Sequence, residues 1–379
     1  MATMAASDSA QDWPALAETL GLRFAERAAA LDESDTFAAE NYAELKQHRV
    51  FSAAVPAEFG GGGASYRELA GFLRVLAHHC GSTALALSMH THTVARTVWT
   101  WKHMDAPVVP LLRRVAAEQM VLISTGGNDW LDSLGTAERV PDGFRITARK
   151  PFASAMPAGT ALATSAVYND PESGPTVLHF SVPVEAKGVR TASNWRTLGM
   201  RATGSDDVLF ENVFVPDAAV AARRPKGVWH PAVHLAGLIA FPLVYSVYLG
   251  VAEAARDIAL GLVPAAKRGD KLVQLMAGEV ENQLTAARLA VEHMVELGAD
   301  TAPGEAVTNV VFTARTLAGE AMLRCVDRAM ELAGGKGFYR VAGLERRLRD
   351  IQAARYHPIR AKEQQVLAGR IALGMPIDG

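Results

Sequence analysis

Hydrophobic and polar residues change their spacing twice along the chain. From Trp13 to about Leu122, apolar residues recur three and four positions apart with charges between them, which predicts amphipathic helices. The next hundred residues contain short β-branched and aromatic runs, such as FRITAR and TVLHFSVPV, bounded by Gly, Pro, Asp and Asn, which is typical of strands. Long helical patterns return after His230. We therefore expect a helical domain at 1–120, a β-barrel or sandwich at 121–228 and four long helices at 229–379.

Composition indicates a globular protein without a strong charge. The 379 residues are 49% hydrophobic and 21% charged, with a formal net charge of −2, so we expect neither a nucleic-acid nor a membrane partner. The longest apolar run, 235–244, is broken by Gly237 and Pro242, which favours a buried helix over a membrane span. Cys80 and Cys325 lie in apolar helical patterns, so we predict two free buried thiols in a reducing cytoplasm.

Three further stretches resemble motifs of the acyl-CoA dehydrogenase superfamily. They are VPAEFGGGG at 55–63, TLGMRATGSDDVLFENVFVPDAAV at 197–220 and ELAGGKGFYRVAGLERRLRD at 331–350, in the family's order and roughly its spacing. The resemblance implies a mainly α fold with a central β domain: an N-terminal helical domain, a β-barrel middle domain and a C-terminal four-helix bundle. It also implies a flavin cofactor and a homotetramer built as a dimer of dimers.

The β domain carries the residues that the resemblance assigns to the flavin. In the family, a Thr of the first strand and a short run after a Gly-x-Lys place hydrogen-bond donors and a hydroxyl against the isoalloxazine ring. The matching residues of this chain are Thr125 in LISTGGND and, after Lys150, Phe152, Ala153 and Ser154. Without the resemblance, the same run would be interpreted as a strand with an inward Phe and a Ser in a turn.

A glycine turn at Gly334, Gly335 and Gly337 permits two interpretations. Glycine commonly ends a helix, and in the family the same turn brings backbone amides to the cofactor of a neighbouring subunit, which requires positions without Cβ. Both can hold at once. The family's Arg-x-x-Phe-Gly, which helps to hold the adenosine end of FAD, is absent from the corresponding stretch VPAAKRGDKLVQL. We therefore expect a weaker hold on adenosine, and the choice between FAD and FMN stays open.

Both places where family members carry the catalytic glutamate lack a carboxylate here. The residue nine places after the Arg of the Arg349-Asp350 pair is Pro358, preceded by His357. The alternative place, ten residues before Gly250, holds Ala240, and the stretch 230–249 contains no acid. Because it lacks both bases, the chain resembles the oxygen-using branch of the superfamily. This branch consists of the two-component flavin monooxygenases of the dibenzothiophene monooxygenase and hydroxyphenylacetate hydroxylase type. In that branch a histidine of this turn stands near flavin supplied in reduced form by a separate reductase.

These observations predict a flavin-dependent oxidoreductase. The leading hypothesis is O2-dependent hydroxylation of a hydrophobic, aromatic or heteroatom-bearing small molecule, with His357 and His92 as catalytic candidates, since histidine can exchange protons near neutral pH. The alternative is α,β-dehydrogenation of an acyl thioester with a substituted base. A third hypothesis is an inactive fold that serves as a binding subunit. The spacing of Cys and His predicts no metal site.

Overall fold

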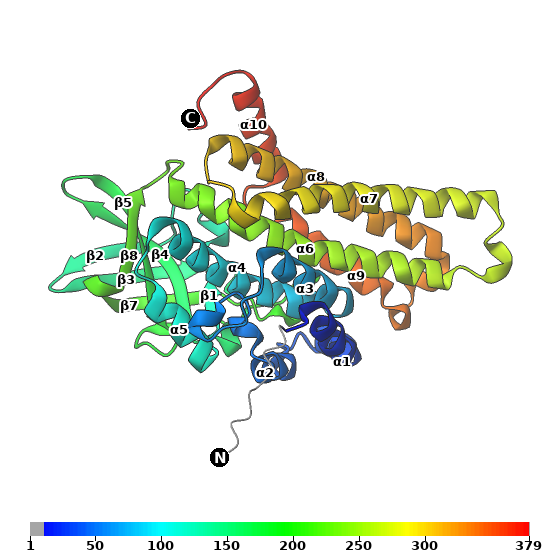
Figure 1. Cartoon of the computed structure of the whole chain (residues 1–379), viewed down its shortest axis with the longest axis horizontal. Helices are drawn as coiled ribbons and strands as arrows, with labels where there is room; N and C mark the ends of the chain where they lie inside the picture. The colour runs from blue at the N-terminus through cyan, green and yellow to red at the C-terminus, as the bar shows by residue number, and fades with distance from the viewer. Residues whose placement is uncertain (1–10, 379) are drawn as a thin grey trace, which may run out of the picture.

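The computed structural model describes residues 11–378, which form a helical part, a β part and a second helical part (Figure 1). The first part consists of α1 (Trp13–Ser34), α2 (Ala39–Gln47), α3 (Tyr66–His79), α4 (Gly81–Met104) and α5 (Val109–Glu118). Helix α3 begins with a capping box: Ser65 accepts from the backbone N–H of Glu68, whose carboxylate accepts from that of Ser65.

The β part is a single sheet of eight strands, which corrects the expectation of a barrel. The strands are β1 (Leu122–Ser124), β2 (Thr136–Val140), β3 (Gly143–Lys150), β4 (Ala161–Asp170), β5 (Gly174–Pro183), β6 (Val189–Thr191), β7 (Val208–Pro216) and β8 (Val220–Pro225). Their order is β6-β7-β3-β2-β4-β5-β8, with β1 parallel to β4. Within the described chain, β6 and β8 do not pair, so the sheet stays open at both edges. Alternation of hydrophobic residues cannot distinguish an open sheet from a closed one.

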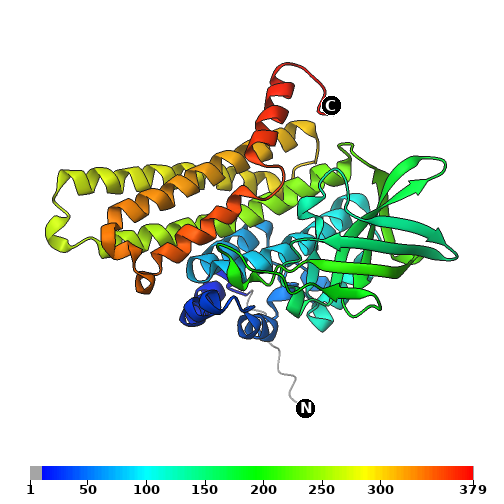
Figure 2. The same cartoon turned by 180° about the vertical axis from the view of Figure 1, so that it is seen from behind.

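The second helical part contains α6 (Pro231–Leu262), α7 (Lys271–Asp300), α8 (Glu305–Ala333), α9 (Leu344–Ile351) and α10 (Ala361–Ala372). The expected fourth long helix is interrupted, because α9 ends at Ile351 and Pro358 lies between α9 and α10. Figure 2 shows α9 and α10 pointing in different directions. The three-part architecture is thus confirmed, although the bundle has three long helices and two short ones. We propose 1–120, 121–228 and 229–379 as the domain limits.

The helix α6 forms the centre of the molecule. It packs against α3, α4, α7, α8 and α9, and α3 approaches so closely that a Cβ on Gly250 would lie 2.1 Å from the carbonyl oxygen of Arg74. By length and composition α6 could cross a membrane, but 89% of its most apolar window is buried inside the protein, as the broken apolar run predicted. The thiols of Cys80 and Cys325 are free and buried, also as predicted.

Candidate functional site

His357 lies after α9 and is held by residues of α6 and α8. Its Nε2 lies 2.5 Å from the hydroxyl oxygen of Tyr248. Arg315 donates from Nη2 to the backbone oxygen of His357 at 2.6 Å, and its guanidinium lies 5.3 Å from the centre of the Tyr245 ring. Tyr245 in turn donates to the carbonyl oxygen of Ala354 at 2.7 Å. The histidine is therefore fixed on both its ring and its backbone.

His357 is neutral at physiological pH, which differs from the sequence expectation of a group that titrates near neutrality. Burial, and then the charge of Arg315, lower its pKa to about 3. Burial raises the pKa of Tyr248 well above its ordinary value. Because both groups are uncharged, the Tyr248 hydroxyl can donate to Nε2 and leave a proton on Nδ1. The pair can thus pass a proton between neutral partners, a role different from that of a histidine that ionises near pH 7.

The second catalytic candidate, His92, lies in the middle of α4 close to the same place. Burial lowers its pKa to about 3, and the charges of Arg96, His90 and His357 act in the same direction. His90 has a structural role, because its Nε2 lies 2.7 Å from the carbonyl oxygen of Phe51 and its Nδ1 accepts from the N–H of Leu122 at 2.9 Å. His92 therefore lies close enough to His357 for their charges to interact, whereas the contacts of His90 assign it to the packing of α4.

None of the charges that shift the pKa values of His92, Arg96 or His357 comes from a carboxylate within the described chain. The first acid of α6, Glu253, accepts from Arg74 at 2.8 Å and from Arg288 at 2.8 Å. Asp350 is buried and accepts from the N–H of Met200 at 2.5 Å. Both carboxylates are thus held in structural contacts, and the cluster itself consists of neutral and cationic groups.

Phe152 and Ser154 lie on the turn after β3. Phe152 has a φ of 62° and is 49% exposed, and its ring is perpendicular to that of the partly buried Trp195, with 6.2 Å between the ring centres. An aromatic pair of this kind next to a buried hydroxyl suits a planar heterocycle such as a flavin. Ala153 is fully buried and its backbone N–H donates to the carbonyl oxygen of Asp206 at 3.0 Å, so a ligand contact there would need this hydrogen bond to exchange. The residues present therefore fit the ring system that the sequence implied.

A row of hydrogen bonds joins this turn to the segment of His357. The Ser154 and Ser205 hydroxyl oxygens lie 2.7 Å apart, and Ser205 lies 2.7 Å from the Thr203 hydroxyl. Thr203 donates to the carbonyl oxygen of Met200 at 2.9 Å, and the Met200 N–H donates to Asp350, seven residues before His357. The β part and the α9 segment are thus fixed relative to each other.

The side chain of Thr125 points into the sheet and is buried there. Its hydroxyl donates to Thr164 Oγ1 at 2.6 Å and its side chain is 1% exposed. The hydroxyl proton that the resemblance assigned to the flavin therefore already has an acceptor on β4. A flavin contact at this position would come from the Thr125 backbone, or from the hydroxyl after it exchanges partners.

The glycine turn lies far from His357 in the same chain. Arg315, which contacts His357, precedes Gly334 by 19 residues on α8, which is about 28 Å along the helix axis. Gly334 has φ 57° and ψ −152°, a conformation nearly restricted to glycine. A Cβ on Gly337 would lie 2.8 Å from the Ala333 Cβ, whereas one on Gly335 would meet nothing within 4 Å. The fold of this chain therefore explains why Gly334 and Gly337 are glycines, but it does not explain Gly335.

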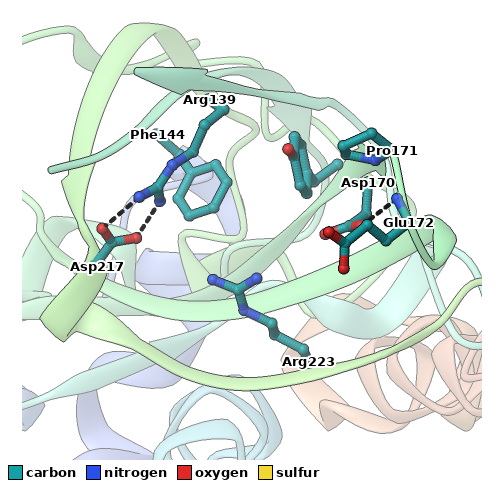
Figure 3. Close-up of a pocket in the computed structure, with 8 residues that line it drawn as sticks. Arg139, Phe144, Asp170, Pro171, Glu172, Asp217 and Arg223 are labelled. Atoms are coloured by element: carbon teal, nitrogen blue, oxygen red, sulfur yellow. Dashed lines mark hydrogen bonds and ion pairs between the residues drawn. The ribbon is translucent and has the colours of Figure 1, made fainter. Parts of the chain in front are cut away.

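A separate hollow lies away from these groups, at the hairpin ends of the sheet (Figure 3). It has a volume of about 500 Å³ and shares no lining residue with the groups above. The guanidinium groups of Arg139 and Arg223 lie 4.8 and 5.6 Å from the centre of the Phe144 ring, and Arg139 pairs with Asp217. It is an open surface hollow and does not take part in the site.

Sequence reasoning missed several residues of the site. Two pairs had a signal in the sequence, because residues three or four apart lie on one face of a helix. These pairs are Tyr245 with Tyr248 on α6, and His92 with Arg96 on α4. Trp195 was contained in none of the motifs. No signal in the sequence linked Tyr248 to His357, because 109 residues separate them.

Comparison with known proteins supports the family resemblance that the sequence motifs indicated. Residues 16–102 match the family described as "Acyl-CoA dehydrogenase, N-terminal domain", and residues 244–361 match "Acyl-CoA dehydrogenase, C-terminal domain". The chain is 29% identical over 355 residues to the amino sugar nitrososynthase RubN8 of Streptomyces rubradiris, covering 88% of this chain and 82% of the relative. It is 27% identical over 367 residues to the cyclohex-1-ene-1-carbonyl-CoA dehydrogenase of Geobacter metallireducens, covering 92% and 93%.

Solved structures share the architecture over nearly the whole chain. KijD3, in complex with FMN and dTDP-3-amino-2,3,6-trideoxy-4-keto-3-methyl-D-glucose, superposes with a TM-score of 0.87 at 25% identity, covering 97% of this chain and 96% of KijD3. FMN-bound TdsC of Paenibacillus sp. A11-2 gives 0.84 at 20% identity, covering 97% and 99%, a likeness of fold alone. The matched families span both helical parts, and the chain belongs to the acyl-CoA dehydrogenase superfamily of flavin-dependent oxidoreductases.

Proposed function

We propose that this enzyme is a flavin-dependent monooxygenase that uses reduced flavin and O2 to oxidise a hydrophobic, aromatic or heteroatom-bearing small molecule. The observation that carries the proposal is the group at the position of the family's base. That position holds Pro358, the neutral His357–Tyr248 pair stands next to it, and the first acid of α6, Glu253, is held by two arginines. Removing the α-proton of a thioester requires a base, and a histidine whose pKa is lowered to about 3 is a poor one.

The neutral pair is better suited to oxygen chemistry. Reduced flavin supplies the electrons and the site of oxygen activation, and the protein must exclude water while it provides one proton at a time. A neutral His357 can give the proton of Nδ1 only as Nε2 takes the proton of the Tyr248 hydroxyl, and Tyr248 must then regain a proton from solvent before the next turnover. Similarity to nitrososynthases supports oxidation at a heteroatom as one form of this reaction.

We infer FMN or FAD as the cofactor, held by Phe152, the Ala153 backbone and Ser154, with Trp195 beside the ring. KijD3 and TdsC bind FMN in their solved structures, and the missing adenosine motif agrees with a flavin held mainly by its ring. A separate flavin reductase would then supply the reduced form. Two buried free thiols agree with the reducing cytoplasm as the place of action.

We further propose a homotetramer. Leu272, Leu275 and Leu289 on α7 are between 60% and 65% exposed, and Leu317 on α8 is 58% exposed. Exposed leucines on two neighbouring helices favour contact with another subunit. The distance of the glycine turn from His357 also supports this arrangement, because Gly335 has free space on its own chain and could approach the flavin of a neighbour.

The competing function is acyl thioester dehydrogenation, which the cyclohex-1-ene-1-carbonyl-CoA dehydrogenase relative favours. The two functions differ without oxygen. We expect oxidised, flavin-loaded enzyme mixed anaerobically with a panel of short, branched and aromatic acyl-CoA thioesters to keep its flavin absorbance. Bleaching by any thioester in wild type and in His357→Ala alike would overturn the monooxygenase proposal and the role of His357 together.

A further inference from the structure

Arg96 is a partly buried arginine without a partner in the described chain. It lies one helical turn after His92 on α4, so both side chains are on one face of the helix. Burial lowers the pKa of Arg96, and no neighbouring carboxylate acts in the opposite direction. Within residues 11–378 its N–H groups make no hydrogen bond and no ion pair, although part of the side chain stays accessible. Five donors and a full charge are thus directed at nothing in the described chain.

The three buried arginines, Arg224, Arg315 and Arg347, donate to backbone carbonyl oxygens, although the Nε of Arg315 has no partner in the described chain. Arg224 donates to the carbonyl oxygens of Trp130, Leu131 and Asp132 at 2.6 to 3.0 Å. Arg315 donates to the carbonyl oxygen of His357, and Arg347 donates to those of His78 and His79 at 3.2 and 3.3 Å. Arg96 is more exposed than these three arginines and makes no such contact within the described chain, so its N–H groups are free to bind an acceptor from outside the chain.

The charge of Arg96 acts on two histidines, one in the proposed reaction centre and one next to a cluster of aromatic side chains around Trp130. On one side its charge acts on His92, which also experiences His357. On the other side it acts on His179, whose pKa is lowered to about 3 by burial, by Arg224 and by Arg96 itself. Arg224 donates to His179 Nε2 at 3.0 Å and also holds the Trp130 backbone. Both facing histidines are neutral, so neither offsets the charge of Arg96.

The aromatic cluster is centred on Trp130. Its ring lies 5.7 Å from the ring centre of Phe241, 5.4 Å from that of Phe312 and 6.2 Å from that of Trp229. Trp130 and Trp229 of this cluster are partly exposed, whereas Phe241 and Phe312 are buried. A molecule with an apolar or aromatic body and an anionic end would match both the aromatic cluster and Arg96.

We propose that the substrate carries an oxyanionic group, with a carboxylate as the simplest form, and that Arg96 binds this group. The planar fork of a guanidinium can donate two parallel hydrogen bonds to a carboxylate. Such a contact would fix one end of the substrate one helical turn from His92. This proposal rests on the function proposed above, whose small-molecule substrate it specifies.

The test compares anionic probes with their neutral isosteres on the FMN-loaded enzyme. Benzoate against benzamide, and phenylacetate against phenylacetamide, are titrated by calorimetry, with quenching of tryptophan fluorescence as a second readout. In wild type we expect each acid to bind about 10- to 100-fold more tightly than its amide, the range of a charge-assisted pair of hydrogen bonds. Arg96→Met should remove this preference, and Arg96→Lys should keep part of it, since lysine retains the charge but loses the fork.

The matched control is Arg223→Met, which removes an exposed guanidinium at the hairpin ends and should leave the preference intact. Acids and amides that behave alike in wild type, or a preference that survives in Arg96→Met, would overturn the proposal. A loss of FMN affinity in Arg96→Met equal to the loss for acids would assign Arg96 to the flavin and overturn it too. Binding needs no turnover, so a preference for acids in a protein that fails the oxygen test would reject the proposed function and retain the anion site.

Discussion

His357→Gln should reduce the sensitivity of the fold to acid. Four histidines, the buried His90 and the partly buried His92, His179 and His357, have pKa values lowered to between about 3 and about 4. Their ordinary value is about 6.5, so on acidification the unfolded chain takes up protons that the folded protein refuses. The stability that these groups provide is complete above about pH 6.5 and is lost as pH falls toward the folded values.

The magnitude follows from the shift. Between about pH 7 and about pH 5.5, each such histidine should lower the free energy of unfolding by about 1.3 kcal/mol, and the four together by about 5 kcal/mol. This figure depends little on the folded pKa, because any value of about 4 or below leaves the folded side chain neutral throughout. His357→Gln should remove one of the four contributions, so its stability should fall by about 1.3 kcal/mol less than that of wild type over the same range.

The assay is urea unfolding of flavin-free protein at a series of pH values, and only the difference in slope between variants is used. His48→Gln, on an exposed histidine, is the control for any effect of the substitution itself. If His357→Gln and wild type ran parallel over the whole range, His357 would be protonated in the folded protein. The neutral His357–Tyr248 pair, and the reasoning built on it, would then be refuted.

Three further predictions concern the flavin, the glycine turn and the assembly. Ser154→Ala should weaken binding of reduced flavin by about 1 kcal/mol in a fluorescence titration, the value of one hydrogen bond, and unchanged affinity and rate would mean that Ser154 does not face the ring. Gly334→Ala should lower the free energy of unfolding by about 1–3 kcal/mol, because alanine disfavours φ 57° with ψ −152°; an unchanged urea midpoint would contradict this. Sedimentation of the 40.4 kDa chain should give the mass of a tetramer, and a monomer that retains flavin would exclude the proposed contact between subunits.

The sequence predicted the helices and strands of this fold better than it predicted how they join and pack. Helical spacing is a local signal, and the structure follows it. The open sheet and the break after Ile351 depend on how distant segments pair and pack. Pro358 did mark the end of the helical segment, but where α9 stops is decided by packing against α6 and α8.

The candidate site also depends on contacts between distant segments, which the sequence did not reveal. Sequence motifs indicated His357, Ser154 and the missing glutamate, because each occupies a fixed place in a recognisable stretch. They could not indicate Tyr248, which reaches His357 across 109 residues, or the neutral state of both side chains. An ionisation state depends on burial and on neighbouring charges such as Arg315, and these exist only in the folded protein.

The most direct test of the central claim is a single turnover with oxygen. Enzyme loaded with reduced FMN is mixed rapidly with O2, and flavin absorbance is followed in wild type, His357→Ala and Tyr248→Phe. We predict a transient species distinct from both reduced and oxidised flavin in wild type. With a substrate present, we predict turnover about 10² to 10⁴ lower in His357→Ala, the usual contribution of a positioned proton donor or acceptor, while flavin affinity stays nearly unchanged. Direct conversion of reduced to oxidised flavin without a transient species in wild type would contradict the claim.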